Sequence, residues 1–259
     1  MSVHEERADA AARNGLPMTG PTLRRPEVEI VMAESASFSL PTVIGAEVAR
    51  ALSEDIITLR LHPASRLTEE EVCSRYGVSR SPVREAFKML EADGLIVRST
   101  RRGVRVTPMS RRDLDEVYTC RAALEGLAAA GAARSADREV DGELSRLIEA
   151  LAVAIASRDA TEFFGHSVAF TSAIHRHSGN GTLTRMLDGI DKQARRYRYL
   201  AHTWTHEMLE VSLQNYREVA EAISLRNGPM AQRRATRMIR RAHAVIARAL
   251  TEAYPGLED

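Results

Sequence analysis

Five polar side chains between residues 79 and 88 have the types and spacing to bind a polyanion: Ser79, Arg80, Ser81, Arg84 and Lys88. Arg80 and Arg84 are four residues apart, so they share one face of a helix. An arginine fork can bind the O6 and N7 atoms of guanine or clamp phosphates, and a serine hydroxyl can donate to a phosphate beside a helix N-terminus. The alternative is that these are solvated groups on an exposed face. The secondary structure expected around them distinguishes the two interpretations.

Two short helices with a tight turn between them are expected to carry this segment. The spacing of Thr68 and Glu71 is that of a capping box, which satisfies free N–H groups at a helix start, and Gly77 stops this first helix. Ser79 is the expected cap of the second helix, and Pro82 falls in its first turn, where its missing N–H costs nothing. The apolar residues of the second helix recur at helical spacing and must pack inward: Val83, Ala86, Phe87 and Leu90.

The period then changes to that of a β-hairpin. Leu95–Val97 and Val104–Val106 are short β-prone runs on either side of a basic, glycine-containing turn. Arg101, Arg102 and Gly103 at its tip are candidates for contact with the DNA backbone or minor groove, and Gly103 lets the turn approach closely. A helix-turn-helix followed by a basic hairpin is a winged helix.

The stretch SRSPVREAFKMLEADGLI, followed by RRGVRV, resembles the DNA-binding domain of GntR-family bacterial transcription regulators. The resemblance implies that Arg80 and Arg84 contact bases or backbone, whereas Lys88 is either a phosphate contact or merely exposed. Where many relatives carry an arginine, this chain has Glu70, which cannot bind a phosphate, so operator recognition is expected to differ. Before the first of the two helices, Pro63-Ala64 replaces the family's Pro-Gly, which predicts a somewhat different turn.

The rest of the chain is expected to form an antiparallel bundle of about six helices, because apolar residues recur at helical spacing and no βα alternation is visible. These helices are predicted over residues 113–134, 140–156, 162–177, 182–200, 208–225 and 230–253. The predicted fold is therefore mostly α. It has a disordered arm (1–40), a winged helix-turn-helix (41–108), a hinge (109–112) and an all-helical domain (113–254). The winged helix-turn-helix has a first helix over 43–61 and a hairpin wing.

The helical half resembles the FCD-type ligand-binding domain of the FadR branch, which implies effector binding and dimerisation. The likeness rests on Arg121-Ala-Ala-Leu124-Glu125, on Phe170 to Leu183 and on Asn215-Tyr216. Many members of that branch hold a divalent metal with one Asp and three His. The resemblance places these positions on Ser167, Thr171, Tyr216 and Met238, which make no usual ligand set. No metal or other cofactor is expected, although a site displaced onto the chain's scattered histidines stays open.

The cavity at these four positions would be rich in hydroxyl groups and partly apolar, which suits an organic effector without an ion. Arg121 is the candidate for pairing with an effector carboxylate, because the resemblance places a pocket arginine there and guanidinium forks match carboxylates. An ion pair with Glu125, four residues later, explains Arg121 equally well. Further candidates are Arg195, Arg198 and, least of all, Asn215.

Composition points to a cytoplasmic protein. The net charge of +1 does not by itself suggest nucleic acid, so a basic surface must be judged locally. Cys73 and Cys120 are far apart and are expected to be reduced. The N-terminus lacks the apolar run of a signal peptide, and no apolar stretch reaches the roughly 18 residues that a membrane span needs.

The predicted function is a sequence-specific transcription regulator, most often a repressor in this family, controlled by a small organic effector. A homodimer on a palindromic duplex operator follows from two half-sites one helical turn apart. Two other functional classes fit the sequence less well. An enzyme would need a nucleophile, base and orienting group, which are not visible, and a winged helix that binds protein would not need an exposed basic helix.

Overall fold

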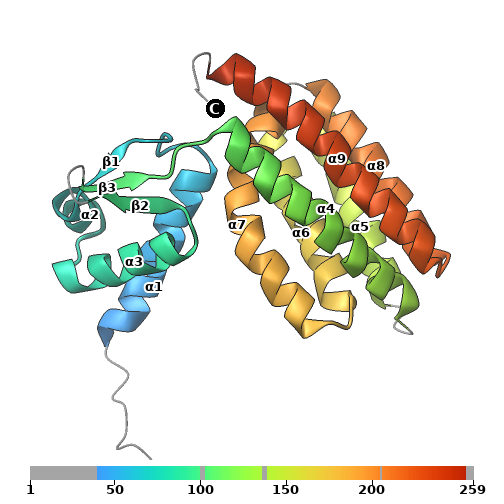
Figure 1. Ribbon diagram of the computed structural model, residues 1–259, viewed down its shortest axis with the longest axis horizontal. Helices are drawn as coiled ribbons and strands as arrows, with labels where there is room; N and C mark the ends of the chain where they lie inside the picture. Colours follow the sequence, from blue (N-terminus) through green and yellow to red (C-terminus); the bar gives the residue numbers. More distant parts are fainter. Residues whose placement is uncertain (1–39, 100–102, 136–138, 205, 255–259) are drawn as a thin grey trace, which may run out of the picture. The chain divides into compact units, whose positions relative to one another are not determined.

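The computed structural model describes residues 40–99, 103–135, 139–204 and 206–254, and these are mostly helical with one small sheet (Figure 1). Within them, side chains are described from residue 43 onward, except at 206 and 207. The expected arm lies outside the described residues, apart from Leu40, which begins the first helix. The predicted fold class, a winged helix followed by a helical bundle, is confirmed.

The helix-turn-helix consists of α2 (Glu69–Tyr76) and α3 (Arg80–Ala92). The predicted capping box is confirmed: the Glu71 N–H donates to Thr68 Oγ1 at 3.2 Å, and the Thr68 N–H donates to Glu71 Oε2 at 3.1 Å. Gly77 ends α2 with a left-handed φ of 64°. Ser79 occupies the N-cap position of α3, but its side chain makes no capping hydrogen bond, which differs from the expected role.

The three-stranded antiparallel sheet has the order β1-β3-β2, with β1 at Arg66–Leu67, β2 at Ile96–Ser99 and β3 at Gly103–Val106. β2 and β3 form the predicted hairpin, in which Ser99 lies opposite Gly103. β1 was not predicted, because two residues are too few to show the alternation that marks a strand. Arg101 and Arg102 lie outside the described residues.

The core of the winged helix fixes which face of α3 points outward. α1 (Leu40–Ile57) packs against α3, and both contribute fully buried side chains such as Leu52 and Phe87. α1 ends at Ile57 instead of Leu61, because Leu59 adopts a left-handed φ of 58°. Since the apolar stripe of α3 is buried in this core, its polar stripe faces away from it.

Six helices complete the described chain. Their bounds match the predicted ones within four residues: α4 (Arg111–Arg134), α5 (Glu139–Ala156), α6 (Ala160–His177), α7 (Gly181–Trp204), α8 (His206–Ser224) and α9 (Gly228–Ala253). α4 contacts α6, α7, α8 and α9, and its most extensive contact is with α9 (Figure 1). The buried alanines of α4 allow this close packing: Ala128, Ala129, Ala130, Ala132 and Ala133.

Three details of α4 and the segment before it differ from the sequence-based expectation. The helix begins inside the predicted hinge, because Ser110 caps it by accepting a hydrogen bond from the Asp113 N–H at 3.0 Å. Met109, also assigned to the hinge, is fully buried in the core of the bundle. Leu127 has the helical spacing of a core residue but is 50% exposed, so the buried stripe of α4 passes beside it.

Candidate nucleic-acid interface and ligand pocket

The outward face of α3 gathers every polar candidate of that segment. Ser79, Arg80, Ser81, Arg84 and Lys88 are all exposed, whereas the apolar residues between them are buried. Gly103, at the described edge of the wing, is also exposed and has a φ of 72°, a conformation that glycine adopts without strain. An exposed basic helix beside a hairpin is the geometry of a winged helix that enters a DNA groove.

Arg84 is held by an acidic residue of the neighbouring helix. Its Nε lies 3.0 Å from Oε1 and 3.1 Å from Oε2 of Glu69, the first residue of α2. The side chain of Arg84 remains 60% exposed and that of Glu69 29% exposed. The hydrogen bond that Arg84 donates to Glu69 and the charge of that carboxylate raise the pKa of the Arg84 guanidinium above its usual value. Arg84 is therefore a charged, oriented and accessible group.

The other cations of this face differ in their surroundings. Lys88 forms an ion pair with Glu85 at 2.8 Å, three residues before it on the same helix. Arg80 has no hydrogen bond or ion pair with any residue that the structure describes, so its fork is available. Pairs between exposed charges contribute little stability, and the Lys88–Glu85 pair can exchange for a phosphate contact.

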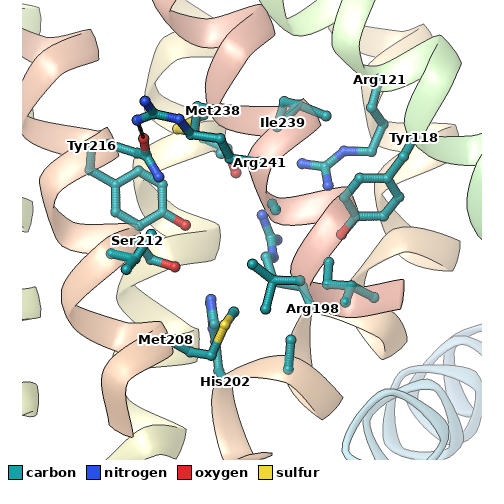
Figure 2. Close-up of a pocket in the computed structure, with 17 residues that line it drawn as sticks. Tyr118, Arg121, Arg198, His202, Met208, Ser212, Tyr216, Met238, Ile239 and Arg241 are labelled. Atoms are coloured by element: carbon teal, nitrogen blue, oxygen red, sulfur yellow. Dashed lines mark hydrogen bonds between the residues drawn. The ribbon is translucent and has the colours of Figure 1, made fainter. Parts of the chain in front are cut away.

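The helical bundle encloses a pocket between α4, α7, α8 and α9, with one residue from α6 (Figure 2). The space, including its open mouth, measures about 550 Å³. Figure 2 shows Tyr118, Arg121, Arg198 and Tyr216 around this space. The lining combines polar residues (Tyr118, Arg121, Thr171, Arg198, His202, Ser212, Asn215, Tyr216 and Arg241) with apolar ones (Ala201, Met208, Val211, Met238, Ile239, Ala242, Val245 and Ile246).

Arg121 belongs to a buried charge network at one wall of the pocket. Its Nη2 lies 2.8 Å from Glu125 Oε1, so the ion pair expected as one of its two roles is present. The second carboxylate oxygen of Glu125 lies 2.9 Å from Nε2 of His175. Burial lowers the pKa of Arg121, but Glu125, Tyr118 and Asp191 together more than offset this and the pKa is raised overall. Burial raises the pKa of Glu125, yet His175 and Arg121 bring it below its usual value.

A second carboxylate, Asp191 of α7, connects three arginines. Its oxygens lie 2.6 Å from Arg195 Nε, 3.3 Å from Arg198 Nη2 and 3.8 Å from Arg121 Nη2. Burial would raise the pKa of Asp191, but Arg198, Arg121 and Arg195 lower it to about 2. Asp191 is thus ionised at neutral pH, and Arg121 and Arg198 are each paired with an acid although they are almost completely buried.

Four polar atoms of the pocket lining are buried without a hydrogen-bond partner among the residues that the structure describes. They are the hydroxyl of Tyr118, Nε of Arg121, Nε of Arg198 and Nδ1 of His202. Burial and the charge of Arg198 lower the pKa of His202 to about 3, so its ring is neutral at neutral pH. Buried polar groups are almost always satisfied, so four unpaired atoms in one pocket mark a place for water or a ligand.

The pocket brings together four of the six residues expected to bind an effector: Arg121, Thr171, Tyr216 and Met238. Ser167 and Arg195 are not among the lining residues. The Ser167 hydroxyl donates to the carbonyl of Phe164 at 2.7 Å, and Arg195 is occupied by Asp191 and partly exposed.

Several residues that line the pocket were weak candidates from the sequence or were not candidates at all, among them Tyr118, Arg198 and His202. The four-residue spacing of Arg198 and His202 on α7 was the available signal, because it places both on one face.

The four family metal positions do not fit a metal ion. Thr171 donates its hydroxyl to the carbonyl of Val168 at 3.1 Å, as Ser167 does to Phe164, while Tyr216 offers a phenol and Met238 a thioether. Two buried guanidinium groups line the same pocket, and the acids paired with them, Glu125 and Asp191, are not among the lining residues that could bind a cation there. Among the described side chains, no group of three or more His, Cys, Asp or Glu residues converges on a metal-sized site.

Comparison with known proteins decides the family. A model described as "Bacterial regulatory proteins, gntR family" matches residues 44–106, and the FCD domain model matches residues 116–241. The uncharacterized HTH-type transcriptional regulator YdhC of Bacillus subtilis is 30% identical over 188 residues, which cover 72% of this chain and 84% of that protein. The chain belongs to the gntR family of bacterial regulatory proteins. This GntR-family protein is a transcription regulator with a DNA-binding head and an effector-binding FCD domain, not an enzyme.

Two further likenesses agree with this assignment. The gluconate operon transcriptional repressor of Bacillus licheniformis is 32% identical over 132 residues, 51% of this chain and 54% of that protein. The structure of E. coli McbR/YncC shares the fold, with a TM-score of 0.70 at 22% identity over 79% of this chain and 97% of that one. None of the helices described for this regulator has the length and apolar character that a bilayer crossing requires.

Proposed function

We propose that this GntR-family regulator is a repressor of the FadR branch, released from its operator by a small organic carboxylate that binds the pocket of the helical bundle. It acts in the cytoplasm as a homodimer on a palindromic duplex, with Ser79, Arg80, Ser81, Arg84, Lys88 and the wing residues 101–103 on the DNA. Its effector and dimer contacts lie in the all-helical domain predicted over residues 113–254, the first helix of which begins at Arg111.

The observation that carries the effector proposal is the set of unpaired polar atoms in the pocket. Three of them, the Tyr118 hydroxyl and the Nε groups of Arg121 and Arg198, can donate to an acceptor, and two of these donors carry positive charge. A carboxylate accepts several hydrogen bonds at once and matches the guanidinium group. The apolar remainder of the lining would pack against the ligand's carbon atoms.

One relative supports the same class of ligand. The repressor from Bacillus licheniformis is named for a gluconate operon, and gluconate is a hydroxylated carboxylate. Hydroxyl groups on such a ligand would meet the side chains of Thr171, Ser212 and Tyr216, which also line the pocket. The carboxylate would meet the buried arginines on the other side.

The test is a thermal-shift titration of the full chain with gluconate, succinate and their uncharged counterparts glucose and 1,4-butanediol. A ligand that binds only the folded state raises the melting temperature, and the rise grows with the logarithm of the ligand concentration above its Kd. We expect a concentration-dependent rise with a carboxylate and none with its neutral partner. Because the pocket does not fit a metal, a chelator should leave both melting curves unchanged.

The matched variants are Tyr118→Phe and Tyr199→Phe. Tyr118→Phe removes one unpaired donor from the pocket, so it should weaken the ligand response about tenfold without destabilising the free protein. Tyr199 is not among the residues that line the pocket, so Tyr199→Phe should respond as the native chain does. Equal responses of charged and neutral probes, or a large loss of stability on chelation, would contradict the proposal.

A further inference from the structure

Glu69 and Arg84 meet in a way that leaves part of the guanidinium group free. Both carboxylate oxygens of Glu69 accept from the same atom, Nε of Arg84, at 3.0 and 3.1 Å. The two terminal amino groups of Arg84 make no hydrogen bond with any described residue. They are the pair of donors with which an arginine forks onto the O6 and N7 atoms of guanine.

We propose that Glu69 is a positioning residue that sets the DNA-sequence specificity of the regulator by holding Arg84 in a base-reading orientation. This inference rests on the proposed contact between Arg84 and DNA. A free arginine loses much rotamer freedom when it docks, whereas an arginine already fixed at Nε loses less. A fixed guanidinium group also points in one direction, which favours hydrogen bonds to a base edge over hydrogen bonds to phosphates that lie at other angles.

The charge of Glu69 acts on affinity and not on specificity. A carboxylate on the DNA-facing side of α2 repels phosphates in every sequence alike, so it weakens specific and non-specific binding by the same factor. The discrimination comes from the orientation of the Arg84 fork, which Glu69 holds at Nε.

The fold does not need Glu69 for α2. The capping box that starts this helix uses Thr68 and Glu71, and the apolar contact of α2 with the core is made by Val72. Glu70, the next residue along α2, is exposed, and the hydrogen bonds and ion pair of Arg84 with described residues are made with Glu69. Glu70 thus supplies a control that changes the charge of the same helix turn by the same amount.

The experiment uses the full chain and a pool of duplexes with a randomised central segment. The native protein, Arg84→Ala, Glu69→Ala, Glu69→Gln and Glu70→Gln are each carried through repeated selection, and the selected sequences are compared. Affinities are then measured by fluorescence anisotropy for a duplex selected by the native protein and for a scrambled duplex of equal length, at several salt concentrations. Melting curves establish that each variant is folded.

We expect Glu69→Ala to lower the ratio of the two affinities about tenfold, and to tighten binding to the scrambled duplex. Glu69→Gln keeps an oxygen that can accept from Nε, so it should retain most of the ratio although its charge is lost. Glu70→Gln should tighten binding to both duplexes equally. In the Arg84→Ala background, Glu69→Ala should change both affinities equally, because no fork remains to be held.

Two different failures can be told apart. If Arg84→Ala selects the same sequences with the same affinity ratio as the native protein, Arg84 does not read bases and the proposed DNA contact is wrong. If Arg84→Ala loses the ratio but Glu69→Ala keeps it, Arg84 reads DNA without help and only the role of Glu69 is overturned. A loss of the affinity ratio in Glu69→Gln as large as in Glu69→Ala would point to charge alone and would also overturn the role of Glu69.

If Glu69→Ala does not fold, the comparison of Glu69→Gln with Glu70→Gln decides. Equal affinity ratios of these two variants, both below the native ratio, would exclude a positioning role for Glu69.

Discussion

Oε2 of Glu125 lies 2.9 Å from Nε2 of His175, while Oε1 of the same carboxylate lies 2.8 Å from Nη2 of Arg121. One buried acid thus connects α4 to α6 and neutralises an arginine of the pocket wall. Both partners of the Arg121–Glu125 pair are 2% exposed, so water does not screen them. Removing one member of such a pair leaves an uncompensated charge in the interior.

Glu125→Ala should therefore lower the free energy of unfolding by about 3–5 kcal/mol, as expected when one partner of a buried ion pair is removed. The measurement is urea denaturation of the full chain at neutral pH. The double variant Arg121→Met with Glu125→Leu should recover part of this loss, because neither charge then remains. A double variant that is less stable than Glu125→Ala would contradict the charge explanation.

Stability should decrease as the pH falls from about 6.5 to 5, because of His202. Its pKa in the folded protein is about 3, well below the value of about 6.5 expected for an unfolded histidine. Between these two values the unfolded chain binds a proton and the folded chain does not, so acid favours unfolding. The loss over this interval should be about 1.5 kcal/mol, and it should be fully absent above the unfolded pKa.

The control for this pH dependence is His202→Gln, which cannot titrate. Its free energy of unfolding should vary less between pH 6.5 and 5 than that of the native chain, and the difference between the two slopes isolates His202. Asp191 and Glu125 have lowered pKa values, so the stability that they contribute is lost only at more acidic pH, below about 4. Parallel curves for the two proteins would show that His202 is not the cause.

Ala64→Gly should stabilise the winged helix. Ala64 has a φ of 64°, in the left-handed region that is costly for any residue with a Cβ, and it is exposed, so no packing is lost. Glycine adopts this conformation freely, and we expect a gain of about 1 kcal/mol in urea denaturation. Ala49→Gly, within α1 and buried, is the opposite control and should be destabilising.

Gly131→Ala should destabilise the bundle by about 1–3 kcal/mol, the usual cost of overpacking. A Cβ at this position would clash with the backbone carbonyl of Ser178, which cannot move without shifting the end of α6. Gly165→Ala is the matched control, because a Cβ there meets nothing within 4 Å. Helix propensity should make that variant more stable, by up to about 1 kcal/mol, in the same thermal and urea measurements.

Local signals made the elements of this fold predictable. Thr68, Glu71 and Gly77 determine α2 through contacts within ten residues, and the six helices of the bundle follow from apolar periodicity. β1 could not be found in this way, because Arg66 and Leu67 become a strand only by pairing with β3.

The sites were less predictable than the elements. The exposed face of α3 follows from its own periodicity, but the contact of Glu69 with Arg84 depends on the angle between two helices. In the pocket, Arg121 and Arg198 meet through Asp191, and neither spacing nor composition links residues so far apart in the chain. The sequence could not show that the Ser167 hydroxyl bonds to the backbone of its own helix, at the carbonyl of Phe164, and that Ser167 is not among the lining residues.

The pairing of Arg121 and Arg198 with resident acids bears on how tightly the regulator can hold a signal molecule. An incoming anion that contacts Arg121 or Arg198 must share guanidinium groups that are already neutralised by Glu125 and Asp191. The gain on binding is then smaller than a bare arginine would give, and the occupied state empties readily when the molecule becomes scarce. Under the proposed function, the occupancy of the pocket therefore follows the prevailing concentration of the metabolite.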